Sequence, residues 1–123
     1  MFDFRINHAR NALYCILEGR FDAEETRRFA ERFRAAVDEL EPGMVIITDL
    51  TGFIPTDEEV RQLAQEATAY AAERGISRAV RIVADSVGSR VGNIQLTRTA
   101  RASGYQADVV TSMDEARSLL GWR

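Results

Sequence analysis

The stretch MVIITDLTGFIPTDEEV, residues Met44 to Val60, decides the fold class of this 123-residue chain. Its first seven residues, Met44 to Leu50, are a nearly continuous apolar run rich in β-branched side chains. Such a run predicts a strand that is covered on both faces, as in a parallel sheet. The residues after it predict a long helix, because an apolar stripe at helical spacing begins at Val60 and continues through Leu63, Ala64, Ala67 and Ala71.

The acidic cluster at the start of this helix has a structural explanation. Thr56 followed by Glu59 forms a capping box, which predicts the helix start. Asp57 and Glu58 then lie in the first turn, where each negative charge favours the helix dipole by about 0.3–1 kcal/mol. Adjacent helix residues project in different directions, and no histidine or cysteine lies nearby in the sequence. We therefore expect neither a catalytic pair nor a metal site here.

Toward the N-terminus, the sequence predicts a hairpin followed by a helix. Phe2, Phe4 and Ile6 alternate, residues 7–11 supply turn residues, and residues 13–17 form a second strand. Asp22 is the predicted N-cap of the helix, with Glu25 completing a capping box. The apolar face of that helix consists of Phe29, Phe33, Val37 and Leu40, and Glu41-Pro-Gly43 stops it.

Toward the C-terminus, strands and helices continue to alternate. Residues 79–84 predict a second buried strand, after Gly75 caps the preceding helix. A weaker helix is expected at about 91–103, then a short strand at 107–110. Ser112 caps the final helix, whose Leu119 and Leu120 are expected to pack. The order is β-β-α-β-α-β-α-β-α, which predicts an α/β fold of one domain, residues 1–123, with a mixed four- to five-stranded sheet covered by helices.

Composition excludes several function classes. The net charge of −3 gives no reason to expect nucleic acid, and no apolar run is long enough to span a membrane. The chain contains no lysine, which excludes Schiff-base chemistry and a lysine-dependent phosphate loop. The single cysteine, Cys15, lies in an apolar run and predicts a buried structural thiol, and His8 lies in the predicted turn. We expect no cofactor and, since the first residues alternate like a strand rather than a signal peptide, a cytoplasmic location.

In the order and spacing of its elements the chain resembles a STAS domain, the fold of bacterial anti-sigma-factor antagonists and of sulfate-transporter tails. Three local patterns carry this resemblance. Gly19-Arg-Phe-Asp22 is similar to the turn before the family's first helix, and Thr48-Asp-Leu-Thr-Gly52 to its Asp-Leu-Ser-Gly strand end. Residues 107–116 are similar to its last strand and the start of its last helix. The resemblance implies a non-enzymatic regulatory module that binds other proteins.

The chain departs from the family at the regulatory position. The antagonists carry a segment of the form Ile-Asp-Ser-Ser-Gly, in which a serine is phosphorylated by the anti-sigma kinase. Here Asp57 aligns with the family's aspartate, and Glu58 and Glu59 stand where the two serines would be. A glutamate carries about one negative charge against roughly −1.5 to −2 for phosphoserine. The switch is therefore lost, fixed, or moved to Thr51 or Thr56, and Thr56 is better explained as an N-cap.

The leading hypothesis is a non-catalytic STAS-like module that binds a protein partner through residues 51–59 and the following helix. The partner would be an anti-sigma-factor-like kinase, another regulator, or a second copy of the chain. The predicted partner-binding residues are Asp22, Asp49, Thr51, Thr56, Asp57, Glu58 and Glu59. The alternatives are a small-ligand or lipid-binding domain of related fold, which a large apolar cavity beside the second helix would favour, and a fixed subunit of a larger regulatory assembly.

A second candidate site lies in residues 86–107, which contain no acidic side chain. Arg98 and Arg101 share a helix face and, with Ser89 and Arg90, could hold an anion or an acidic partner. The simpler interpretation is a solvated helix face.

Overall fold

The structure of the chain is a computed structural model in which residues 1–54, 58–84 and 106–122 are described, with only the backbone described at 58–64 and 106. The elements in chain order are β1 (Phe2–Asn7), β2 (Ala12–Arg20), α1 (Ala23–Asp38), β3 (Val45–Ile54), α2 (Glu58–Glu73), β4 (Arg78–Ile82), β5 (Gln106–Val110) and α4 (Met113–Leu120). The helix predicted at about 91–103 lies outside the described residues.

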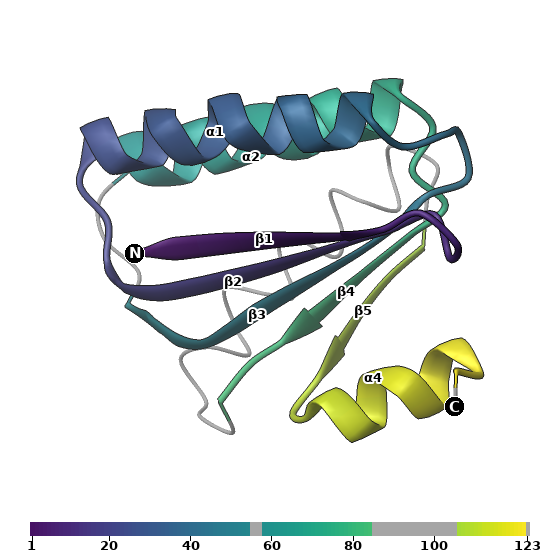
Figure 1. Ribbon diagram of the computed structural model, residues 1–123. Coiled ribbons are helices and arrows are strands. Elements are labelled where there is room, and N and C mark those ends of the chain that lie inside the picture. Colours follow the sequence, from purple (N-terminus) through teal and green to yellow (C-terminus); the bar gives the residue numbers. More distant parts are fainter. Residues whose placement is uncertain (55–57, 85–105, 123) are drawn as a thin grey trace.

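The strands form one five-stranded sheet in the order β1-β2-β3-β4-β5. β1 is antiparallel to β2, and each further pair is parallel. Helices α1 and α2 lie side by side over one face of this sheet, and α4 lies on the other face (Figure 1). The prediction of a mixed α/β sheet with covering helices is therefore confirmed.

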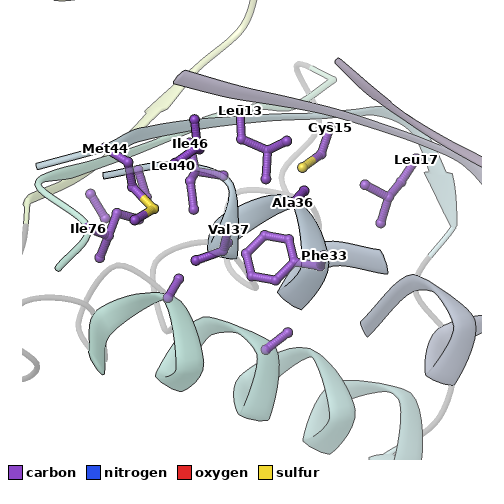
Figure 2. Close-up of a cluster of buried hydrophobic side chains, with 14 of the residues drawn as sticks. Leu13, Cys15, Leu17, Phe33, Ala36, Val37, Leu40, Met44, Ile46 and Ile76 are labelled. Carbon is purple, nitrogen blue, oxygen red and sulfur yellow. The ribbon is translucent and has the colours of Figure 1, made fainter. Parts of the chain in front are cut away.

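The larger part of the core lies between the sheet and the pair α1 and α2. Leu13, Cys15 and Leu17 point from β2 toward α1, which presents Phe33 and Val37 (Figure 2). These five side chains are all buried, and Leu13 and Cys15 are fully enclosed. The alternation along β2 and the helical spacing along α1 thus bury the same apolar stripes that the sequence predicts.

A smaller cluster lies on the other face, under α4. It contains Ile47, Val80 and Val110 from three parallel strands and Ala116 from the helix, with Leu120 packed against its rim. The prediction that Leu119 packs is wrong, since Leu119 is 38% exposed. Successive helix residues differ by about 100° in direction, so the face that buries Ala116 and Leu120 turns Leu119 toward solvent.

The helix ends follow the sequence signals. Asp22 caps α1, accepting a hydrogen bond of 2.7 Å from the Glu25 amide, and Ser112 caps α4 in the same way through the Glu115 amide at 3.1 Å. Gly75 follows α2 with φ of +92°, a conformation that favours glycine. Helix α1 ends at Asp38, just before the predicted stop at residues 41–43.

Candidate functional site

The candidate site lies at the carboxyl ends of β2 and β3. These strands are parallel, and Arg20 at the end of β2 is the register partner of Ile54 at the end of β3. Helix α1 begins three residues after Arg20, and α2 begins four residues after Ile54. The N-termini of both helices therefore lie at the same end of the sheet, where α/β folds commonly place binding groups.

Strand β3 is longer than the predicted run, which ended at Leu50. It continues through Thr51, Gly52 and Phe53 to Ile54, so the first part of the predicted junction is strand. An irregularity in the register makes this extension possible, because Ile16 pairs with Asp49 but Glu18 pairs with Gly52. The extra residue in β3 is a β-bulge, a feature enriched at strand ends and binding sites.

The bulge lets two non-alternating side chains face the same core. Leu50 and Phe53 are three residues apart, yet both pack against the cluster under α1 and α2. The Phe53 ring lies 5.4 Å from the Phe21 ring at nearly a right angle, a favourable edge-to-face contact. Gly52 lies opposite Glu18, whose Cγ would be 3.4 Å from an added Cβ. The Asp-Leu-Thr-Gly pattern thus forms the bulge itself.

Asp49 and Thr51 form a local pair on the face of the sheet away from α1 and α2. One carboxylate oxygen of Asp49 accepts hydrogen bonds from the Thr51 amide at 3.0 Å and from the Thr51 hydroxyl at 2.7 Å. Desolvation by burial raises the pKa of the Tyr14 phenol, and the negative charge of Asp49 adds to this rise. The Thr51 hydroxyl is therefore already engaged by a negatively charged neighbour.

The other predicted partner-binding residues fall into three groups. Asp22 is the α1 N-cap, so its carboxylate has a structural task. Glu58 and Glu59 are the first two residues of α2 in the described part of the chain. Thr56 and Asp57 lie outside the described residues, as do Ser89, Arg90, Arg98 and Arg101 of the second candidate site.

The predicted residues do not gather at one point. Asp49 lies five residues before the end of β3, about 16 Å along the strand from Ile54 at the usual rise per residue. It also faces the α4 side, because Ile47, two residues earlier, belongs to the cluster under α4. Among the predicted residues that the structure describes, Asp22 and the start of α2 share the carboxyl-end surface with Ile54.

Ile54 is a surface residue that the sequence analysis did not single out. Its side chain is 48% exposed at the end of β3, which makes it one of few large exposed apolar side chains in the described part of the chain. The signal in the sequence was weak, because an apolar residue next to an apolar run is normally assigned to the core. Ile54 therefore adds an exposed apolar side chain to the surface at the carboxyl ends of β2 and β3, just before the acidic start of α2.

Arg81 is a second residue that the sequence analysis missed. It lies in the middle of β4, between register partners Thr48 and Val109, and is only 8% exposed. Its side chain projects to the same face as Ala79, the face covered by α1 and α2. The sequence signal for this residue was a charged side chain within a strand predicted to be buried. Burying a guanidinium is costly, so such a position calls for a compensating partner.

Cys15 offers no chemistry to this surface. Its thiol is fully buried in the core, and burial raises its pKa well above the usual range, so it stays protonated. His8 is exposed in the hairpin turn, as expected.

Among the described residues, no three histidine, cysteine, aspartate or glutamate side chains gather closely enough to hold a metal ion. None of the helices in that part of the chain is long and apolar enough to cross a membrane.

Two surface depressions in the described residues lie around the first residues of the chain. One, of about 410 Å³, is lined by residues 1–3 with Ile16 and Glu18. The other, of about 500 Å³, lies between Phe2 and the outer side of α1. Both are open to solvent, and neither is beside α2, where the small-ligand alternative would place its cavity.

Comparison with solved structures agrees with this architecture. The phosphorylated form of the Bacillus cell fate determinant SpoIIAA superposes with a TM-score of 0.62 at 14% sequence identity, over 98% of this chain and 99% of that one. The chain has a STAS-like fold. No protein-family model matches the sequence, and no curated protein sequence matches it significantly. The similarity therefore lies in the fold.

Proposed function

We propose that the protein is a non-catalytic STAS-like regulatory module that binds a protein partner through the surface at the carboxyl ends of β2 and β3. This surface, called here the junction surface, consists of Asp22, Ile54 and the start of α2 at Glu58 and Glu59. The main support for this proposal is the exposed side chain of Ile54, which lies at the end of a parallel strand just before the acidic start of α2. Exposed apolar area rimmed by polar groups is typical of protein interaction sites.

The charge of the junction surface defines the partner. Asp22 and the first residues of α2, Glu58 and Glu59, are acidic, and the surface also contains one basic residue, the exposed Arg20, which is the register partner of Ile54. Because the three acidic residues outnumber Arg20, a complementary partner offers an apolar spot with a net positive charge beside it. A partner built for an uncharged serine junction would meet two like or uncompensated charges, which cost several kcal/mol and abolish micromolar binding.

The proposed module is not switched by serine phosphorylation at the position used by the antagonists. Residues 57 to 60 carry no hydroxyl group. Thr51 is a poor substitute, because a phosphate there would lie against the Asp49 carboxylate that now accepts its hydroxyl hydrogen bond. The small-ligand alternative has no supporting observation in the described residues.

The proposal is tested by affinity capture from the source cells with two matched variants. Ile54→Arg places a bulky charge at the junction surface, and Leu119→Arg makes the same change at a similarly exposed apolar residue on α4. A partner of the junction surface is captured by the wild type and by Leu119→Arg but not by Ile54→Arg. Capture of the same proteins by all three chains would contradict the proposal.

The charge argument has its own test with a purified anti-sigma-factor-like kinase. We expect no tight binding of the wild type in calorimetry, and improved binding of Glu58→Ser, which keeps a residue acceptable in a first helical turn. If the wild type binds tightly and Glu58→Ser binds no better, the carboxylates do not control partner choice.

A further inference from the structure

The free edge of the sheet is strand β1, which pairs only with β2 among the described strands. Met1 and Glu18 exchange two backbone hydrogen bonds, of 2.8 and 2.9 Å. Because such pairs alternate along an antiparallel ladder, Asp3, Arg5 and Asn7 also direct their backbone groups toward β2. The amides and carbonyls of Phe2, Phe4 and Ile6 therefore point outward from the edge.

This edge is complementary to itself. If a second copy pairs with β1 in antiparallel fashion, centred on Phe4, then Phe2 of each chain lies opposite Ile6 of the other. The three outward-facing residues of each chain then meet in hydrogen-bonded pairs. In the same register Asp3 of each chain lies directly opposite Arg5 of the other, which gives two symmetric pairs of opposite charge.

The side chains required for this pairing are available. Asp3 and Arg5 are 64% and 75% exposed, and their nearest charged atoms are 3.9 Å apart within one chain. In the single chain a carboxylate oxygen of Asp3 accepts a hydrogen bond of 2.9 Å from the Phe4 amide, the central outward-facing donor. In the paired register the carbonyl of Phe4 from the other copy takes that donor, and Asp3 turns to the facing Arg5.

The surface next to the edge does not oppose a second copy. The depression between Phe2 and α1 is lined by two arginines, Arg28 and Arg32, and by two glutamates, Glu25 and Glu31. The Met1 ammonium also lines it and pairs with Glu25 at 3.0 Å, so charges of both signs are interspersed and create no large like-charge field between two identical surfaces. Phe2, Phe4 and Phe29 pack together behind the edge and hold β1 against α1.

We propose that β1 is a self-association surface, through which two copies pair antiparallel about Phe4 and are held in register by Asp3 and Arg5 of opposite chains. This site is independent of the junction surface, which lies at the ends of β2 and β3. The partner at this edge is a second copy of the chain, because a two-fold rotation brings Asp3 opposite Arg5 and the outward-facing backbone groups opposite each other.

Charge reversal tests the register. In a dimer of Asp3→Arg, the two basic residues of one chain face the two basic residues of the other. In a dimer of Arg5→Asp, two acidic residues face two acidic residues. By sedimentation equilibrium, each variant alone should dimerise about ten- to a hundredfold more weakly than the wild type, because two attractive pairs become repulsive. An equimolar mixture of the two variants, and the double variant Asp3→Arg/Arg5→Asp, should regain wild-type dimerisation.

The control is Glu73→Arg, which makes the same charge change as Asp3→Arg at an exposed residue of α2. It should dimerise like the wild type, and circular dichroism should show all variants folded. As an independent readout, the amides of Phe2, Phe4 and Ile6 should become more protected from hydrogen exchange as the wild-type concentration rises.

Two results would overturn the proposal. One is a wild type that remains monomeric up to about 500 µM, beyond the range expected of a specific interface. The other is stronger association of Asp3→Ala than of the wild type. That outcome would show that Asp3 blocks the edge by occupying the Phe4 amide, a known way of preventing edge-to-edge pairing.

Discussion

Asp22 belongs to the predicted partner-binding set and also caps α1, and one pair of substitutions separates these two roles. Asp22→Ala removes the acceptor of the 2.7 Å hydrogen bond from the Glu25 amide. Asp22→Asn keeps a side-chain oxygen that can cap the helix and removes only the charge. The stability difference between the variants therefore measures the cap, and any binding difference they share measures the charge.

The expected magnitude follows from the position of α1. Loss of an N-cap costs about 1 kcal/mol, within a range of about 0.5–2. The cost should reach the whole fold, because α1 contributes the buried Phe33, Ala36 and Val37 to the main core. For a chain of this size, 1 kcal/mol lowers the melting temperature by about 4 °C. In urea the midpoint should fall by about 0.5 M with an unchanged slope.

Asp22→Asn should stay within about 0.5 kcal/mol of the wild type, because asparagine caps helices about as well as aspartate. Equal midpoints for Asp22→Ala and the wild type would show that the cap does not stabilise the fold. Equal destabilisation by both variants would show that the charge at the helix start matters, rather than the hydrogen bond.

Three further predictions follow from the described side chains. Cys15 should not react with a thiol reagent at about pH 8 in the native protein, where burial raises its pKa, and should react fully in urea. Hydrogen bonds from the Thr111 amide and hydroxyl lower the pKa of Glu115 in the folded protein. The ionised Glu115 carboxylate therefore stabilises the fold above its unfolded-state pKa of about 4.3, and this stabilisation is lost as the pH falls through the lower folded-state pKa. The stability gap between the wild type and Glu115→Gln, measured by denaturation, should therefore be wider at neutral pH than in acid. After incubation with an anti-sigma-type serine kinase and ATP, mass spectrometry should find no phosphate at residues 57–60 and none at Thr51, and stoichiometric phosphate on Thr51 or Thr56 would mean that the switch has moved.

The strand and helix order could be predicted from the sequence because the main signals are local. The β-branched run of β3, the alternation in β1 and the caps at Asp22 and Ser112 each depend on residues within one element. The buried strands and the amphipathic helices then leave few arrangements besides a covered mixed sheet.

The end of β3 could not be predicted in this way. Its last residues pair with Glu18, Gly19 and Arg20 of β2, which are more than 30 positions away in the sequence. The bulge also breaks the two-residue period, since Leu50 and Phe53 face the same core. A search for alternation therefore ends the strand at Leu50 and assigns the following residues to a junction.

The candidate site was predicted as Asp22 together with residues between 49 and 59, and among the described ones Asp49 and Thr51 lie apart from Asp22 and the start of α2. Asp49 and Thr51 bind each other on the α4 face, a local contact that their spacing of two residues permits. The exposed Ile54 and the buried Arg81 were missed because their environments are set by neighbouring strands. Exposure at a strand end and burial within one are properties of the sheet rather than of a sequence window.

The placement of Thr51 bears directly on how the proposed module is regulated. A phosphorylation switch requires a hydroxyl that is free to react and surroundings that tolerate about two added negative charges. Thr51 fits the second requirement poorly, because its hydroxyl donates to the Asp49 carboxylate at 2.7 Å and a phosphate there would lie against that negative charge. The STAS resemblance aligns Glu58 and Glu59 with the antagonists' serines, and neither a kinase nor a phosphatase changes the charge of a glutamate. Partner binding at the junction surface would then respond to the concentrations of the protein and its partner, since the charge at that surface is constant.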